Sequence, residues 1–321
     1  MTSTTEIVSK KPFYMKMDGL IYPGFFSSKC FREAMDYKPQ AEDVFIVTYP
    51  KCGTTWMQNV ALHIFRKGKE LEETSQFLRH CPFIDMCGKE SIDKMPRPGA
   101  FKTHLSYTHM PYSSKAKYIF VARNPKDCAV SLFHHTRNQP GFMYWDGEFN
   151  VLFELFMTGQ AEYNDYFDHL LSWYPHRNDP NLYYTTYEDM KKDIKKVIVD
   201  LAKFLGDEFI GAIEKDNSVL NNIVNFSSFE FMKKKFGEVY DLKPKEGETL
   251  TEPNTYEGLQ HIRNLISEID LPNVLPEYKF IRKGIVGDWK NALTEEQAER
   301  LDRKFKEKTE GTDIPNWFSI S

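Results

Sequence analysis

Residues 49–56, with the sequence YPKCGTTW, bring together a cation, a glycine and two hydroxyl side chains. Lys51 supplies a mobile positive charge, and Gly53 lets the backbone approach an anion closely. The N–H groups of Thr54 and Thr55 come at the start of a predicted helix, where the helix dipole favours negative charge. This combination predicts a phosphate-binding loop, with an ordinary turn between strand and helix as the alternative. The pattern GxxxxGK followed by Ser or Thr occurs nowhere in the sequence, so the loop is only P-loop-like.

A second candidate for anion binding begins at Arg123, which ends another predicted strand. Sheets of the α/β class bind ligands at this edge. Arg123 can hold a phosphate through two hydrogen bonds, and Ser131, two helical turns later, can donate another. Asp127 and Ser131 are four residues apart and therefore share a helix face. The alternative is a capped helix with a salt bridge.

Lys102 and His104 alternate along a predicted strand, so their side chains face the same way. The positive charge of Lys102 disfavours the protonated form of His104. A neutral histidine can accept a proton near pH 7, which makes His104 a candidate general base. The sequence has nine histidines, and a structural role is the alternative for any one of them.

Two cations and a glycine also stand together near the C-terminus, at Arg282, Lys283 and Gly284. They could bind a further phosphate. A solvated surface turn is the alternative for such a triplet.

The pattern of apolar residues predicts strands that alternate with helices. Four short apolar runs are predicted strands, at 44–48, 100–105, 118–122 and 182–186. Helical spacing predicts helices at 54–66, from Pro125 onward, at 150–173, at 187–205 and from Thr294 onward. We expect one α/β domain with a mainly parallel central sheet flanked by helices. Residues 233–256 are charged and weakly periodic, which predicts a loop, either a lid or a solvated excursion.

Composition narrows the class of protein. The 321 residues are 41% hydrophobic and carry a net charge of −4, so we expect a globular protein that does not bind nucleic acid through its overall charge. The five cysteines form no CxxC pair, which argues against a disulfide framework or a zinc site. The N-terminus lacks the apolar run of a signal peptide, and no stretch is apolar enough to span a membrane. We therefore expect a cytoplasmic protein.

Read together and in this order, the segments 49–56, 102–104, 123–131 and 282–290 resemble the cytosolic sulfotransferase family. The resemblance spans the chain from Asp18 to its end. It implies a flexible segment at 1–17, a sulfotransferase domain at 18–321 and a small-molecule acceptor. It also implies the donor 3′-phosphoadenosine 5′-phosphosulfate (PAPS), the product 3′-phosphoadenosine 5′-phosphate (PAP) and no requirement for a metal.

The resemblance also assigns roles to single residues. His104 matches the base that takes the proton of the acceptor, and Lys51 matches the lysine beside the bridging oxygen. Lys102 matches a second cation near the transferred group, and Ser131 matches a serine that binds the 3′-phosphate. The positions that match the donor site are Lys51, Cys52, Gly53, Thr54, Thr55, Trp56, Arg123, Ser131, Tyr187, Ser227, Phe229, Arg282, Lys283 and Gly284.

The acceptor is predicted from composition, because aromatic residues make up 15% of the chain. An aromatic pocket suits a phenol or a phenolic amine, with Asp85 or Asp146 as a candidate partner for the amine. A sterol or an aliphatic alcohol is the alternative acceptor. The candidate pocket residues are Phe25, Phe26, Phe83, Lys102, His104, Phe142 and Tyr144.

Two departures from the family pattern carry further expectations. Cys52 stands where Ser or Ala is frequent, at a predicted helix N-terminus beside Lys51, so we expect a lowered thiol pKa and activity that is sensitive to oxidation. The family's dimer motif reads Lys-x-x-x-Thr-Val-x-x-x-Glu. Here Lys290, Thr294 and Glu299 match it, but Glu295 replaces the valine. A carboxylate at an apolar contact is costly, so we expect this homodimer mode to be weakened.

Three rival functions remain at the level of the sequence. The first is a nucleotide kinase with an aberrant phosphate loop, which would need Mg²⁺ and a carboxylate ligand. The second is a binding protein that sequesters a small molecule without turnover. The third, a Golgi carbohydrate sulfotransferase, would need a membrane anchor.

Overall fold

A four-stranded parallel sheet forms the centre of the molecule in the computed structural model, which describes residues 11–73, 76–236, 256–269 and 281–318. Its strand order is β4-β3-β5-β6, and all three neighbouring pairs are parallel. The strands are β3 (Val44–Thr48), β4 (Phe101–Thr103), β5 (Lys117–Ala122) and β6 (Leu182–Thr186). All five residues of β3 are buried, which is typical of a parallel sheet covered on both faces. The predicted fold class is confirmed.

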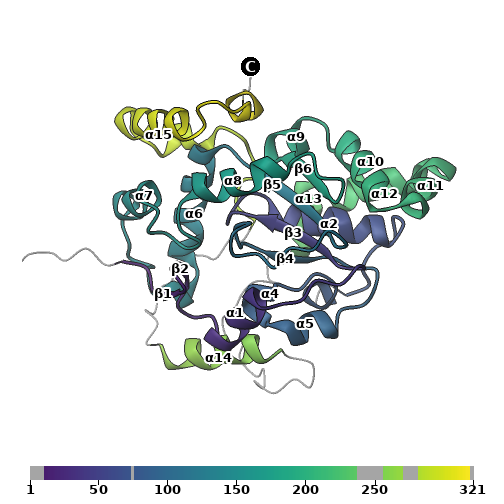
Figure 1. Cartoon of the computed structure of the whole chain (residues 1–321), viewed down its shortest axis with the longest axis horizontal. Coiled ribbons are helices and arrows are strands. Elements are labelled where there is room, and N and C mark those ends of the chain that lie inside the picture. The colour runs from purple at the N-terminus through teal and green to yellow at the C-terminus, as the bar shows by residue number, and fades with distance from the viewer. Residues whose placement is uncertain (1–10, 74–75, 237–255, 270–280, 319–321) are drawn as a thin grey trace, which may run out of the picture.

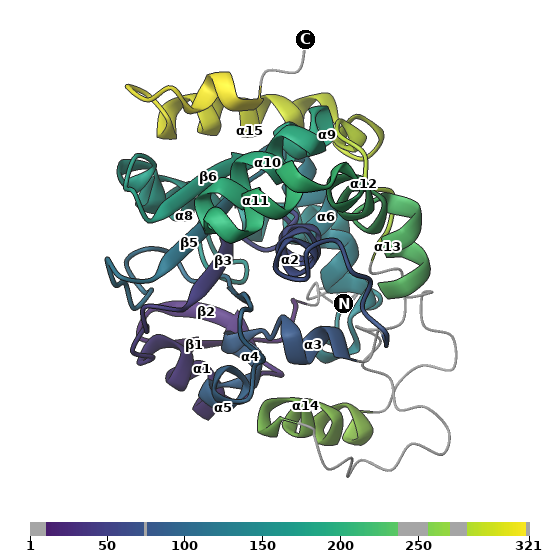
Figure 2. The same cartoon turned by 90° about the vertical axis from the view of Figure 1, so that its right-hand side faces the viewer.

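Side chains of the strands point alternately into two apolar clusters, one on each face of the sheet. Ile46 packs on one face with residues of α2 (Thr54–Phe65) and α10 (Ile194–Leu205). Phe45 and Val47 pack on the other face. That second cluster includes residues of α6 (Pro125–Asn138) and α8 (Tyr166–Trp173). The helices surround the sheet in Figure 1, and Figure 2 shows α10 and α11 (Asp207–Lys215) side by side.

Two predicted helices are each broken in two. The predicted helix 150–173 is α7 (Phe149–Met157) and α8, separated by a turn in which Tyr163 and Asn164 have positive φ angles of 60° and 64°. The predicted helix 187–205 is α9 (Tyr187–Lys192) and α10. In both cases an aspartate begins the second helix by accepting hydrogen bonds from its first N–H groups, Asp165 in α8 and Asp193 in α10. The local capping signal outweighs the apolar periodicity.

The helix after β5 begins as predicted. Pro125 takes its first position, and the side chain of Asn124 caps it by accepting from the Lys126 N–H. The last long helix is α15 (Glu295–Lys308), and Thr294 and Gln297 form a capping box at its start.

The remaining elements lie around this frame. Residues Tyr14–Met17 and Leu20–Pro23 form the hairpin β1–β2, while residues 1–10 of the expected N-terminal segment lie outside the described residues. Of the expected loop 233–256, only 233–236, the end of α13, and Tyr256 are described. The other helices are α1 (Ser28–Met35), α3 (Phe77–His80), α4 (Ile84–Cys87), α5 (Lys89–Asp93), α12 (Asn217–Phe226), α13 (Phe229–Phe236) and α14 (Glu257–Glu268), with short 3-10 turns at Pro140–Phe142, Tyr174–His176, Asp288–Asn291 and Ile314–Phe318.

Candidate active site

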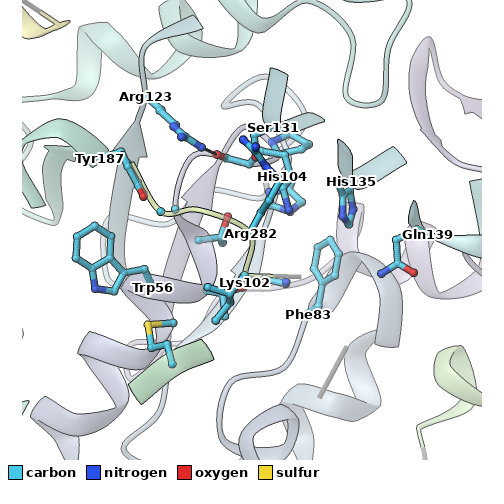
Figure 3. Close-up of a pocket in the computed structure, with 18 of the residues that line it drawn as sticks. Trp56, Phe83, Lys102, His104, Arg123, Ser131, His135, Gln139, Tyr187 and Arg282 are labelled. Carbon is cyan, nitrogen blue, oxygen red and sulfur yellow. Dashed lines mark hydrogen bonds between the residues drawn. The ribbon is translucent and has the colours of Figure 1, made fainter. Parts of the chain in front are cut away.

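One cavity lies at the carboxyl ends of the parallel strands. Lys51 follows β3, His104 follows β4 and Arg123 follows β5, and all three line this cavity. Figure 3 shows its two ends, with Trp56 and Arg123 at one side and Phe83 at the other. Adjacent parallel strands place their carboxyl ends at one edge, which explains why segments far apart in sequence meet here.

The loop 49–56 has the backbone geometry of an anion-binding turn. Lys51 and Gly53 have positive φ angles of 71° and 95°. A Cβ atom on Gly53 would lie 2.8 Å from the ring of Tyr187, so glycine is required by space as well as by φ. No side chain caps α2, which begins at Thr54. Its first N–H groups are therefore available to an anion.

Arg123 organises the end of the cavity that Trp56 lines (Figure 3). Its Nη1 donates to the carbonyl of Lys51 at 2.9 Å, and its guanidinium lies 4.3 Å from the centre of the Tyr187 ring. The Tyr187 ring also contacts that of Trp56, with centres 5.4 Å apart. Within the described part of the chain, Arg123 Nε and the hydroxyl of Ser227 are buried without a hydrogen-bond partner. Both residues line the cavity, so a polar ligand could supply the hydrogen bonds that these two groups lack.

The C-terminal triplet also lines the cavity and is held in place by carboxylates. Arg282 and Lys283 donate to the carboxylate of Asp288 at 2.6 and 2.7 Å. Gly284 has a φ of 63°, and a Cβ there would lie 2.5 Å from the ring of Phe229. Asp127 accepts from the N–H groups of residues 287 and 289, so it ties α6 to this segment. From the sequence, Asp127 was expected either to share a ligand-binding helix face with Ser131 or to form a salt bridge. Its hydrogen bonds to the backbone N–H groups of another segment were not predicted.

Hydrogen bonds hold His104 at the centre of the cavity. Its Nδ1 lies 2.8 Å from the carbonyl oxygen of Thr48, and its backbone N–H donates to Asp85 at 2.9 Å. Asp85 also accepts from the hydroxyl of Tyr163 at 2.8 Å. Burial, followed by the charge of Lys102, holds the pKa of His104 well below its usual value. A neutral ring that donates from Nδ1 to a carbonyl leaves Nε2 as the proton acceptor.

Two lysines flank this histidine, Lys102, which is buried, and Lys51, which is partly buried. Burial lowers the pKa of Lys51 to about 8, and the charge of Lys102 acts in the same direction. Burial likewise lowers the pKa of Lys102 to about 8. The Lys102 ammonium lies 4.5 Å from the centre of the Phe83 ring. Cations brought together at such a cost favour a bound anion.

Aromatic rings form the other end of the cavity. Phe25 contacts Phe142 and Phe26 contacts Phe83, with ring centres 4.9 and 5.5 Å apart. Tyr144 was predicted to join them, but this prediction is wrong. It is fully buried, and its hydroxyl donates to the carbonyl of residue 148 at 2.7 Å.

Four polar lining residues at this end were not predicted from the sequence. They are His135, Gln139, Glu162 and Tyr163. His135 follows Ser131 by four residues on α6, and Gln139, the C-cap of this helix, follows by four more, so helical spacing was a usable signal. Glu162 and Tyr163 lie in the turn that was taken for a continuous helix, which gave no such signal.

Cys52 differs from its prediction. Burial raises the pKa of its thiol well above the usual value. Its Sγ points away from the cavity, 3.8 Å from the Sγ of Cys128 and 3.9 Å from the carbonyl of Pro50. The expected low pKa is wrong because the side chain enters the core instead of facing the helix N-terminus. The other predicted donor-site residues all line the cavity.

The described residues contain neither a candidate metal site nor a membrane-spanning helix. No three His, Cys, Asp or Glu side chains in those ranges are grouped as metal ligands. Across the same ranges, no helix has the length and apolar character needed to cross a membrane.

Comparison with known proteins gives consistent matches along most of the chain. The sulfotransferase domain family matches residues 41–259 and 260–313. The amine sulfotransferase of Oryctolagus cuniculus is 32% identical over 289 residues, which are 87% of this chain and 84% of that protein. Sulfotransferase 1C2 of Homo sapiens is 33% identical over 295 residues, 88% of each protein.

Solved structures give the same result. The crystal structure of mouse sulfotransferase SULT7A1 complexed with PAP aligns with a TM-score of 0.67 at 28% identity, over 94% of this chain and 96% of that one. A retinol dehydratase in complex with androsterone and inactive cofactor PAP shares the fold, with a TM-score of 0.66 at 21% identity over 94% and 91% of the two chains.

Proposed function

Because the chain belongs to the sulfotransferase family, we propose that its cavity transfers a sulfonate group from PAPS to the hydroxyl or amine of a small phenolic or monoamine acceptor, with His104 as general base. The coarser activity, sulfonate transfer from PAPS to a small-molecule acceptor, is that of the family. The observation that carries the finer proposal is the orientation of His104, whose Nδ1 faces the Thr48 carbonyl and leaves Nε2 to accept a proton.

The donor end of the cavity fits the nucleotide. PAPS supplies the sulfonate group when it is bound. The open N–H groups at the start of α2 and the ammonium of Lys51 would hold its phosphosulfate. The cations Arg123 and Arg282 and the hydroxyl of Ser131 would hold the 3′-phosphate, with Lys283 and Gly284. The adenine would contact Trp56, Tyr187, Ser227 and Phe229.

The residues around the reacting centre have separate tasks. His104 accepts the proton of the acceptor hydroxyl at Nε2, which makes the oxygen a better nucleophile. Lys51 and Lys102 stabilise the negative charge that develops on the leaving side, because they already carry their charge inside the cavity. Positioning and electrostatics dominate such in-line transfers, so the chain needs no covalent step of its own.

The chemical class of the acceptor is inferred from the aromatic end of the cavity. Paired rings of Phe25 with Phe142 and of Phe26 with Phe83 favour a flat aromatic acceptor. A sterol or an aliphatic alcohol is the alternative class. An acceptor panel that includes phenols, phenolic amines, sterols and alcohols separates these classes by kcat/KM.

His104→Ala tests the base directly. We expect turnover to fall by about 10²–10⁴-fold, since a general base contributes that much to the rate. The affinity for PAP, measured by calorimetry, should stay within about twofold because His104 lies outside the donor contacts. Unchanged turnover would exclude His104 as the base.

The same assay separates the rival functions. A nucleotide kinase would lose activity with EDTA and transfer phosphate instead of labelled sulfonate. A sequestering protein would bind PAP and a phenol without product. Transfer of labelled sulfonate in the presence of EDTA excludes both.

A further inference from the structure

One carboxyl group lines the cavity among the described residues, and it belongs to Glu162. The residue is 3% exposed, and its Oε1 is buried without a hydrogen-bond partner. It lies in the turn between α7 and α8, directly before Tyr163. The Tyr163 ring lies 5.2 Å from that of His104, and Glu162, Tyr163 and His104 all line the same cavity.

The carboxylates that the sequence offered for an amine do not serve this purpose. Asp85 does not line the cavity, and its Oδ2 already accepts from the His104 N–H and the Tyr163 hydroxyl. Asp146 is exposed and does not line the cavity either. Of the acidic residues that the structure describes, Glu162 is therefore the one that an acceptor would meet.

The surroundings of Glu162 place it between the lysine and the aromatic end. Burial raises the pKa of Glu162 to about 8, while the charge of Lys51 opposes this shift. On the aromatic side, burial and then the charge of Glu162 raise the pKa of Tyr14. The Tyr14 ring packs edge-on against Phe142, with centres 5.8 Å apart. The charge of Glu162 therefore interacts with Lys51 on one side and with Tyr14, which packs on the aromatic end, on the other.

A buried carboxylate oxygen without a partner is costly, and a cationic ligand would remove that cost. With a pKa of about 8, the Glu162 carboxyl is mostly protonated at pH 7 in the empty cavity. An ammonium group would favour its ionised form and give Oε1 a charge-assisted hydrogen bond. Lys51 alone is a poor permanent partner, because its charge is also required by the anionic donor. A neutral phenol would leave the oxygen unsatisfied.

We propose that Glu162 binds the ammonium group of the acceptor and so makes the enzyme selective for phenols that carry an amine. The inference rests on the proposed transfer to a phenolic acceptor and narrows its substrate class. Glu162 is a specificity determinant in this proposal, while His104 remains the base at the phenolic oxygen.

The test compares two acceptors that differ only in the amine, tyramine and para-ethylphenol. Wild type should show the higher kcat/KM with tyramine. Glu162→Gln keeps the shape of the side chain and removes its charge, so kcat/KM for tyramine should fall by about 10–100-fold, the range of a hydrogen bond to a charged group. The value for para-ethylphenol should stay within about twofold, and PAP affinity should be unchanged.

Glu148→Gln is the matched control, since Glu148 is exposed and does not line the cavity. It should leave both acceptors unaffected. An equal loss with both acceptors, or a loss of PAP affinity, would overturn the inference and make Glu162 a partner of Lys51. An active wild type without a tyramine preference would overturn this inference alone. A wild type that binds PAP but sulfonates neither phenol would overturn the phenolic acceptor as well.

Discussion

The histidine at the centre of the site is oriented by neighbours that are distant in sequence. The Lys102–His104 pair was predicted to keep the ring neutral by like charge, and the pKa of His104 is indeed held well below its usual value. Burial is the larger cause, however, and burial was not readable from the local pattern. The carbonyl of Thr48 and the carboxylate of Asp85, which fix the ring and its backbone, come from other elements. A motif therefore identified the residue, while the fold determined its tautomer.

The lowered pKa values of Lys51 and Lys102 predict how donor binding depends on pH. Both have a pKa of about 8 in the empty cavity, and a bound anion raises it. Above pH 8 the free protein has lost these protons, so binding must take them up. The affinity for PAP should therefore fall as pH rises through 8, by up to about tenfold per pH unit for each lysine.

Calorimetry in two buffers of different ionisation enthalpy measures this proton uptake. Lys102→Met should remove one proton from the total at pH 9. A PAP affinity that is flat between pH 7 and 9.5 would contradict the lowered pKa values.

At the scale of elements, contiguous motifs were easier to predict than turns. Residues 49–56 carry their strand end, glycine and helix start in one stretch, and they form the predicted loop. The break at 158–165 was missed because the apolar positions of α7 and α8 continue one helical pattern across it. That break places Glu162 and Tyr163 at the cavity, so the acceptor end was predicted less well than the donor end.

The loop geometry makes Gly53→Ala a sharp test of the donor site. Alanine at a φ of 95° would be strained, and its Cβ would lie 2.8 Å from the Tyr187 ring. We expect the free energy of unfolding to fall by about 1–3 kcal/mol and PAP binding to weaken as the loop shifts. Urea unfolding and calorimetry measure the two effects.

Gly311→Ala provides the matched control. Gly311 also has a positive φ, 77°, but a Cβ there would meet no atom within 4 Å, and the residue does not line the cavity. Gly311→Ala should lower the free energy of unfolding through backbone strain but leave the PAP affinity unchanged. Equal effects of the two substitutions on PAP affinity would show that the loop geometry is irrelevant to the donor.

For the whole molecule, one sheet edge explains why the donor site could be predicted and the acceptor site only in part. Lys51 and Arg123, which we propose to bind the donor, follow strands of the same parallel sheet, and the topology brings such strand ends together. The proposed acceptor end is assembled from the residues that follow β2, from α4, from α6 and from the turn between α7 and α8. Only tertiary packing joins these pieces.

Assembly of two copies should depend on the start of α15. Glu295, which replaces the valine of the family's dimer motif, is exposed in the first turn of this helix. Covering its carboxylate with an apolar partner surface would cost free energy unless a cation accompanied it. We therefore expect sedimentation to find monomers at micromolar concentration, and Glu295→Val to shift the equilibrium toward dimers by about tenfold or more. Glu296→Val, at the neighbouring exposed position outside the motif, should leave the equilibrium unchanged. A tight wild-type dimer that Lys290→Ala dissociates would show that the motif tolerates the carboxylate, with Lys290 then the residue to examine as its counter-charge.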